Sequence, residues 1–282
     1  MGLFDMLFGR NKSFSQQNQN TQSNKNEPNP QSVSAVPRSS TSLDLSKQSM
    51  LNLSKEDSLN QLNLKKDIIQ SLCLEKNVNN LTARVAVVMD FSGSMEFLYR
   101  NGTVQAILDR LLPVAMQFDD NGEMEVWLFS NNYIRMPDIS LNNYYNYLNN
   151  ERVMTKYRMG GTQYAPVIND VVRKYTLEDK SDLPTFVLFI TDGDNFDSDK
   201  AHSTQAIINA SKYPIFWQFV GIGDDSFKYL EELDEMDGRY VDNANFFSIN
   251  DLMSIDDNVL YNRLLNEYPH WISKVKDLGM IK

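Results

Sequence analysis

Short β-rich runs that alternate with helix-spaced segments are the feature of this sequence that most constrains its fold. Three runs have the length and composition of buried strands: Arg84–Asp90, Thr185–Thr191 and Ile215–Gly221. Three segments repeat apolar residues at helical spacing: Thr103–Phe118, Ala165–Tyr175 and Ala201–Ala210. This alternation predicts an α/β fold with a doubly wound, mostly parallel open sheet and helices on both faces.

The rest of residues 83–280 predicts smaller elements around this sheet. Glu125–Ser130 is expected to be a strand, and Tyr133–Met136 to pair with it as a hairpin. Pro113 is expected to kink or shorten its helix, because proline lacks the N–H that an interior helical position uses. We also expect a short helix at Leu141–Leu148, a helix at Phe227–Met236, short strands at Arg239–Val241 and Phe246–Ile249, and a closing helix at Asn258–Lys276.

Composition divides the chain into a tail (residues 1–42), an arm or linker (43–82) and a domain (83–280). From residue 11 the tail is rich in Asn, Gln, Ser and Pro, so it cannot bury enough apolar surface to offset its ordering entropy, and we expect it to be disordered. Its short apolar start, residues 1–10, has large apolar side chains at helical spacing. This start could dock on a membrane or on a partner, or it could be a poorly ordered end.

The arm repeats a Leu-x-Leu pattern that begins at Leu43, Leu51 and Leu62. The pattern suggests short strands, whereas Lys66–Leu74 has helical spacing. We expect the arm to pack on or near the domain.

Charge and cysteine content exclude several classes of function. A net charge of −10 makes the chain a poor binder of nucleic acid and anionic lipid, because both are polyanions. The single cysteine, Cys73, allows no intrachain disulfide, and His202 and His270 lie in expected helices far from the polar motif described below. We therefore expect neither a Ser-His-Asp centre nor a His-rich zinc site. We expect no secretory signal and no membrane-spanning helix, because no apolar run approaches the ~20 residues that such a helix needs. The lack of an intrachain disulfide agrees with a reducing cytoplasm.

Oxygen-bearing side chains follow the apolar strands at the points where these strands end. Asp90, Ser92 and Ser94 follow the first strand, and Asp192 follows Thr185–Thr191. Thr162 lies between them in a Gly-Gly-Thr turn before a helix. Ligands of open α/β sheets bind at the carboxyl ends of strands, so these groups are expected to meet. Hydroxyls and only two carboxylates suit a hard divalent cation, and they leave it electrophilic toward one more oxygen donor.

The order and separation of these five residues resemble the metal-ion-dependent adhesion site of von Willebrand factor A (vWA) domains. The resemblance covers about residues 80–280 and implies that Ser92, Ser94 and Thr162 contact the metal directly. It implies that Asp90 and Asp192 act through water, and that a carboxylate from a protein partner takes the open position. Mg²⁺ is the expected ion, with Mn²⁺ or Ca²⁺ as alternatives.

Longer blocks are similar to the vWA domain of TerF-like tellurium-resistance proteins: Arg84–Met95, Tyr99–Gln105, Asp119–Phe129, Tyr213–Gly221 and Val241–Phe247. This resemblance implies a bacterial cytoplasmic protein that acts in resistance to tellurite and other stress. The expected function is a metal-dependent protein-interaction module without catalysis.

Two other functions stay open as alternatives. The first is a metal-dependent hydrolase or phosphatase, although Ser92 occupies the position where an aspartyl-phosphate enzyme has a second Asp. The second is direct binding of tellurite or another oxyanion, which the net charge opposes.

Other conspicuous residues have simpler interpretations. The acidic run Asp192, Asp194, Asp197 and Asp199 is interpreted as a solvated loop in preference to a second cation site. Aromatic residues in the strands and the last helix are expected to pack in the core: Trp127, Phe216, Trp217, Phe219 and Trp271. Tyr144, Tyr145 and Tyr147 could form either an aromatic partner surface or part of an exposed helix.

Overall fold

The computed structural model describes residues 54–119, 121–251 and 253–282. The expectations for the tail, and for the first two Leu-x-Leu repeats up to residue 53, fall outside these residues.

Six strands form one sheet in the order β3-β2-β1-β4-β5-β6. The strands are β1 (Arg84–Asp90), β2 (Glu125–Phe129), β3 (Tyr133–Arg135), β4 (Thr185–Thr191), β5 (Ile215–Ile222) and β6 (Ala244–Ile249). All neighbouring pairs are parallel except β2 and β3, which form the predicted hairpin. From β1 the chain adds strands on one side and then, from β4, on the other. The carboxyl ends of β1 and β4 therefore form the switch point where such sheets bind ligands.

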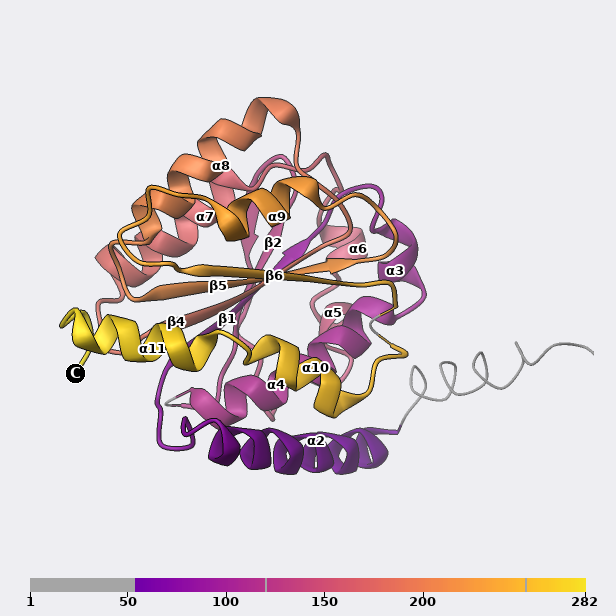
Figure 1. Cartoon of the computed structure of the whole chain (residues 1–282). Coiled ribbons are helices and arrows are strands. Elements are labelled where there is room, and N and C mark those ends of the chain that lie inside the picture. The colour runs from indigo at the N-terminus through magenta and orange to yellow at the C-terminus, as the bar shows by residue number, and fades with distance from the viewer. Residues whose placement is uncertain (1–53, 120, 252) are drawn as a thin grey trace, which may run out of the picture. The chain divides into compact units, whose positions relative to one another are not determined.

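Helices cover both faces of the sheet (Figure 1), which confirms the predicted doubly wound α/β fold. One face carries α7 (Ala165–Arg173), α8 (Asp197–Ala210) and α9 (Lys228–Glu235). The other carries α4 (Thr103–Phe118), α10 (Asp257–Leu264) and α11 (Tyr268–Asp277). Successive residues of β1 serve the two layers in turn, because side chains alternate across a strand: Val85, Val87 and Met89 join the α4 layer, and Ala86 and Val88 the α7 layer.

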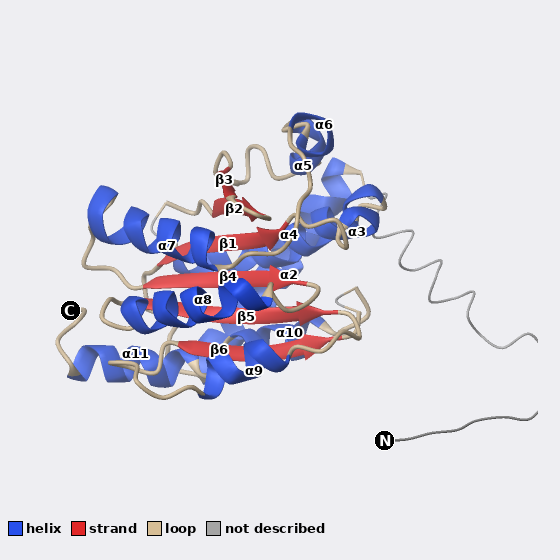
Figure 2. Ribbon diagram, turned by 90° about the horizontal axis from the view of Figure 1, so that it is seen from above, coloured by secondary structure: helices blue, strands red, loops and turns tan. Residues whose placement is uncertain are grey.

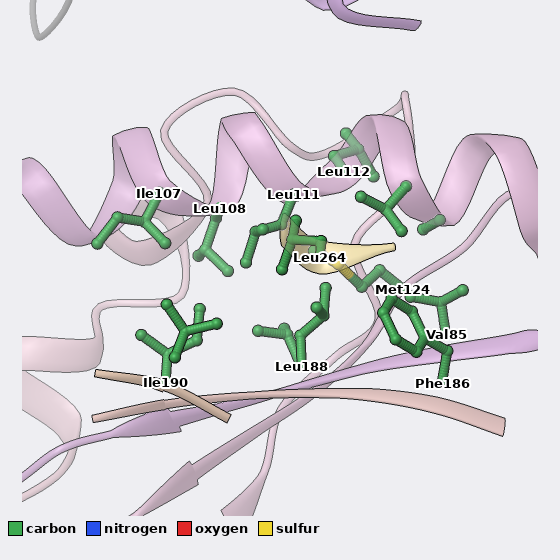
Figure 3. Close-up of a cluster of buried hydrophobic side chains, with 14 of the residues drawn as sticks. Val85, Ile107, Leu108, Leu111, Leu112, Met124, Phe186, Leu188, Ile190 and Leu264 are labelled. Atoms are coloured by element: carbon green, nitrogen blue, oxygen red, sulfur yellow. The ribbon is translucent and has the colours of Figure 1, made fainter. Parts of the chain in front are cut away.

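The core between α4 and the sheet contains many aliphatic side chains, together with Phe186 and Met124 (Figure 3). Leu108, Leu111 and Leu112 of α4 meet Leu188 and Ile190 of β4, and all five are buried. Burial of one such side chain stabilises the fold by roughly 1.5–3 kcal/mol. This layer also explains why α4 runs through Pro113 without being shortened, since packing on both sides of the proline outweighs its cost of about 3 kcal/mol.

A long helix, α2 (Lys55–Glu75), lies outside this layer and packs on α4 and α10 (Figure 1). Its buried residues include Leu62, Ile69 and Cys73, which recur at helical spacing. The hydroxyl of Ser54 caps the helix by accepting a hydrogen bond from the N–H of Asp57 at 3.1 Å. The strand suggested by Leu62-Asn63-Leu64 is therefore wrong, because only one leucine of the pair faces the domain.

Three further expectations about small elements are wrong. Arg239–Val241 forms no strand, because the Arg239 guanidinium turns back to donate to the carbonyls of Asp234 and Met236 after α9. The closing helix is divided into α10 and α11, and Pro269 stands in the first turn of α11, where no N–H is needed. Within Leu141–Leu148, regular helix begins only at α5 (Tyr147–Asn150). Tyr144 and Tyr147 are buried, so they form neither a partner surface nor an exposed helix.

The remaining short elements are α3 (Glu96–Arg100), α6 (Val153–Lys156) and the π-helical turn η1 (Lys174–Glu178). Viewed onto the face of the sheet that carries α7, α8 and α9, the parallel strands end at the same edge, where α3 follows β1 (Figure 2). The predicted site residues lie at this edge.

Candidate metal site

Asp90 is the last residue of β1 and is completely buried. Its Oδ1 accepts a hydrogen bond from the Ser92 N–H at 2.7 Å, and its Oδ2 accepts one from the Thr191 hydroxyl at 2.7 Å. No Lys or Arg of the described residues forms an ion pair with it. Burial raises the pKa of Asp90 to about 6, although the hydrogen bonds from Ser92 and Thr191 oppose this effect.

Ser92, Ser94 and Asp192 meet beside Asp90. The Ser92 and Ser94 hydroxyl oxygens are 3.0 Å apart, and the Ser94 hydroxyl donates to Asp192 Oδ1 at 2.9 Å. Ser94 is 98 positions from Asp192 in the chain, so this contact depends on the pairing of β1 with β4. Burial also raises the pKa of Asp192, against the hydrogen bond from Ser94.

The loop that carries Thr162 is fixed to the same edge through its main chain. Gly160 forms a parallel bridge with Ser92 and accepts a hydrogen bond from the Gly93 N–H at 3.0 Å. The Gly161 N–H donates to Asn131 Oδ1 at 2.7 Å. Within the described part of the chain, the Thr162 hydroxyl has no hydrogen-bond partner. The structure thus brings Asp90, Ser92, Ser94 and Asp192 together by hydrogen bonds, and it pairs Gly160, two residues before Thr162, with Ser92.

Asp199 positions the loop that carries Thr162 by binding the residues that follow it. Its Oδ2 accepts hydrogen bonds from the N–H groups of Tyr164 and Ala165 at the start of α7, at 2.6 Å and 3.2 Å. Asn195 and Ser203 donate to the same carboxylate. The interpretation of the acidic run as a solvated loop is therefore wrong for Asp199, which is 5% exposed. A carboxylate at a helix N-terminus is stabilised by the unpaired N–H groups there.

The arrangement of oxygens fits a hard divalent cation. Ligands at ~2.1 Å in octahedral geometry lie about 3.0 Å from their neighbours. The Ser92–Ser94 and Ser94–Asp192 oxygen pairs have separations of 3.0 Å and 2.9 Å. The donors are hydroxyls and carboxylates, which suit Mg²⁺, Mn²⁺ or Ca²⁺ better than soft metals. No group of three or more His, Cys, Asp or Glu side chains able to hold a metal occurs among the described residues.

Three residues of the site were not predicted. Thr191 donates to Asp90, the Tyr99 phenol donates to the Asp90 carbonyl at 2.9 Å, and the Phe196 N–H donates to the Thr162 carbonyl at 3.0 Å. Thr191 could have been found because it is the last residue of β4 and directly precedes Asp192. Tyr99 and Phe196 have no signal in spacing, because they act from a helix and from a loop.

Cys73 is buried on α2, and burial raises the pKa of its thiol to about 12. The thiol is therefore protonated at neutral pH and is a weak nucleophile. His202 lies on α8 and His270 on α11, as expected.

A family model for the vWA domain found in the TerF C terminus matches residues 82–281. The chain belongs to this vWA-TerF-like family. It is 40% identical over 227 residues to the uncharacterized protein YcbR of Bacillus subtilis, a match that covers 78% of this chain and 90% of YcbR. It is 29% identical over 115 residues to the E3 ubiquitin-protein ligase RGLG5 of Arabidopsis thaliana, covering 36% of this chain and 26% of the ligase.

Solved structures with a similar arrangement share little sequence with this chain. BatB from Bacteroides thetaiotaomicron has a TM-score of 0.41 and 16% identity, covering 69% of this chain and 99% of BatB. VWA2 from Sulfolobus acidocaldarius has a TM-score of 0.40 and 16% identity, covering 66% of this chain and 45% of VWA2. Proximal thread matrix protein 1 of the mussel byssus, solved with a zinc-occupied MIDAS motif, has a TM-score of 0.40 and 16% identity, covering 64% and 46%.

Among the helices described for this chain, none is both long and apolar enough to cross a membrane.

Proposed function

We propose that this protein is a metal-dependent protein-interaction module. Its Asp90, Ser92, Ser94, Thr162 and Asp192 bind one divalent cation, most favourably Mg²⁺, with Mn²⁺ or Ca²⁺ as alternatives. The observation that carries the proposal is the meeting of Ser92, Ser94 and Asp192 oxygens beside a buried Asp90 that forms no ion pair within the part of the chain that the structure describes. A buried carboxylate is costly unless a positive charge accompanies it, and a bound cation supplies that charge.

The partner is proposed to supply a carboxylate to the metal. Asp90 and Asp192 together carry two negative charges, which only neutralise a divalent ion. The ion therefore still attracts another anionic oxygen. Ser94 is exposed, so the ion is approachable from that side.

A binding role is favoured over nucleophilic catalysis by the contacts of Asp90. Both oxygens of its carboxylate already accept hydrogen bonds, from Ser92 and Thr191, and the group lies beneath the surface. An aspartyl nucleophile needs one oxygen free to attack.

We propose further that the protein is cytoplasmic and belongs to a bacterial tellurium and stress-resistance system. The family match over residues 82–281 supports this setting, since the matched family is the vWA domain of TerF.

The function is tested by affinity capture from a lysate of the organism that encodes the chain, followed by mass spectrometry. Capture by the full chain in Mg²⁺ is compared with capture in EDTA and with Asp90→Ala and Asp277→Asn in Mg²⁺. Asp277 is an exposed residue at the end of α11 and serves as the matched control. We expect one set of partners to be lost in EDTA and with Asp90→Ala, and retained with Asp277→Asn. Equal recovery in all four samples would refute the proposal.

A further inference from the structure

Two phenylalanines beside the candidate site are exposed to solvent. Phe97 is 71% exposed and Phe196 is 47% exposed, and every other phenylalanine among the described residues is buried or partly buried. Phe97 comes three residues after Ser94, and Phe196 comes four residues after Asp192. Exposed large apolar groups that cluster at one place on a protein surface indicate an interaction site, whereas scattered ones do not.

The ring of Phe196 is held against the Thr162 loop. Its N–H donates to the Thr162 carbonyl at 3.0 Å, and a Cβ on Gly161 would lie 2.3 Å from Phe196 Cζ. Gly161 is therefore required for this close approach, and any larger residue would displace the ring. Phe196 is thus placed beside Thr162 while nearly half of it stays open to solvent.

Phe97 lies on the same side of its segment as Ser94. The N–H groups of Met95 and Glu96 donate to the carbonyls of Ser92 and Gly93, which makes consecutive turns that lead into α3. Residues three apart in such turns are neighbours on one face. Ser94 and Phe97 are both exposed, so both are open to a partner that approaches this segment.

The charges around the site limit what the partner can be. Asp194 lies on the same loop as Asp192, and Asp197 begins α8 directly after this loop. Asp225 is also close to the loop, since a Cβ on Gly193 would lie 2.9 Å from the Asp225 Oδ2. Lys200 forms an ion pair with Asp197 at 3.0 Å. A segment with many acidic residues would be repelled here, so one carboxylate with uncharged neighbours fits best.

We infer that Phe97 and Phe196 form an apolar rim that selects partner segments in which one Asp or Glu is flanked by large apolar side chains. This inference rests on the proposed metal-dependent function. The metal would hold the carboxylate, and the two rings would bury the flanking side chains. The rim would therefore decide which acidic segments bind, because the metal alone would accept any accessible carboxylate.

The probe is a synthetic peptide array with a central Asp and every residue type at the two preceding and two following positions. The full chain is applied in Mg²⁺, and the best peptides are measured by fluorescence anisotropy. We expect peptides with Leu, Ile, Phe, Tyr or Trp flanks to bind about tenfold more tightly than Ser-flanked ones. Binding should be lost in EDTA and when the central Asp is replaced by Asn.

Variants of the protein test whether Phe97 and Phe196 cause the preference for apolar flanks. Phe196→Ala and Phe97→Ala are expected to weaken the apolar-flanked peptides about tenfold and to leave Ser-flanked peptides unchanged. Leu177→Ala, which removes another exposed apolar side chain, is the control (Leu177 is 67% exposed). Calorimetry with Mg²⁺ alone should give the same affinity for all these proteins, which shows that the loops are intact.

The outcomes separate this inference from the proposed function. Absence of Mg²⁺ binding by the unmodified chain would refute the metal site and the inference with it. If the unmodified chain binds Mg²⁺ normally, three peptide results would refute the rim and leave the metal site standing. These are equal binding of peptides with apolar and Ser flanks, no binding of any peptide, and equal peptide affinities of both Phe variants and Leu177→Ala.

Discussion

Two buried aspartates, Asp90 and Asp170, differ in the groups that donate hydrogen bonds to their carboxylates. They are 0% and 2% exposed, and they lie at the end of β1 and on α7, respectively. Asp170, on α7, accepts hydrogen bonds from the Trp127 indole at 2.9 Å and from Arg135 at 2.6 Å and 3.0 Å. Arg173 donates to it as well. Asp90 receives hydrogen bonds only from neutral groups, those of Ser92 and Thr191, among the described residues.

The effect of these partners on acidity is opposite. Burial alone would raise the pKa of Asp170, but the bonds from Arg135, Trp127 and Arg173 lower it to about 2. Burial raises the pKa of Asp90 to about 6 because hydroxyl and amide donors compensate only in part. Arg135 and Arg173 supply cations to Asp170, whereas no Lys or Arg among the described residues pairs with Asp90. The comparison indicates that Asp170 is a structural group, and it supports the proposal that a cation from solution accompanies Asp90.

The largest expected effect comes from removing the structural carboxylate. Asp170→Ala leaves two guanidinium groups without their shared partner, and loss of one member of a buried pair costs about 3–5 kcal/mol. Arg135 and Arg173 are partly exposed and can be solvated, so we expect about 3 kcal/mol. Urea unfolding in EDTA measures it. A loss no larger than that of an ordinary surface substitution would show that the network contributes little.

The next effect separates the two aspartates by their response to metal. At a Mg²⁺ concentration 100 times its dissociation constant, the unmodified chain should gain about 2.7 kcal/mol in the free energy of unfolding. Asp90→Asn should abolish this gain, because the amide carries no charge to balance the ion. Thermal or urea unfolding with and without Mg²⁺ gives the values, with Asp277→Asn as the control. An equal gain in the free energy of unfolding from Mg²⁺ in Asp90→Asn would show that Asp90 does not contribute to Mg²⁺ binding.

The pH dependence should also differ in sign. In EDTA, folded Asp90 holds its proton up to about pH 6, whereas an unfolded Asp loses it near pH 3.9, so stability falls as pH rises between these values. The decrease is about 2 kcal/mol and should be absent in Asp90→Asn. Asp170 has a pKa below the unfolded value, so its contribution is present above about pH 4 and is lost as pH falls toward 2. Chemical unfolding from pH 3.5 to 7 gives the free energy of unfolding of the unmodified chain and of Asp90→Asn, and the difference between the two curves is the contribution of Asp90. Parallel curves would contradict the raised pKa of Asp90.

The smallest effect is expected at the outer edge of the Asp170 network. Glu178 forms an ion pair with Arg135 at 2.6 Å, but both side chains are partly exposed. Exposed ion pairs contribute little because water solvates both charges. Glu178→Ala should leave the urea midpoint of unfolding unchanged within error. A loss comparable to that of Asp170→Ala would mean that the network acts as one unit.

The contrast between the two aspartates also explains what could be predicted from the sequence. Asp90, Ser92, Ser94 and Asp192 could be found because each follows an apolar strand, and parallel strands bring their ends to one edge. Asp170 could not be found, because its partner Arg135 is 35 positions away on a different element and the pair forms no pattern. Ion pairs between distant elements depend on the finished packing, which spacing does not show.

The fold was predicted best where hydrophobic patterns are long. The sheet and its covering helices follow from apolar runs whose period is clear. The arm was predicted in part: Lys66–Leu74 is helical, as its spacing indicated. The strand at Leu62–Leu64 was wrong because these two leucines imitate a strand pattern over three residues, whereas the burial of Ile69 and Cys73 needs the whole helix. Tyr144 was misplaced because an amphipathic residue can be buried or exposed, and its neighbours in the folded chain decide which.

The central claim is that the edge at Asp90 binds one divalent cation. Isothermal titration of Mg²⁺ into the metal-free full chain tests it most directly, beside Asp90→Asn, Ser94→Ala and Asp277→Asn. Ser94 is exposed, so Ser94→Ala serves as a second site variant if Asp90→Asn fails to fold. We predict one Mg²⁺ per chain for the unmodified protein and Asp277→Asn, at least tenfold weaker binding for Ser94→Ala, and none for Asp90→Asn. No binding to the unmodified chain, or equal binding to all four proteins, would contradict the account.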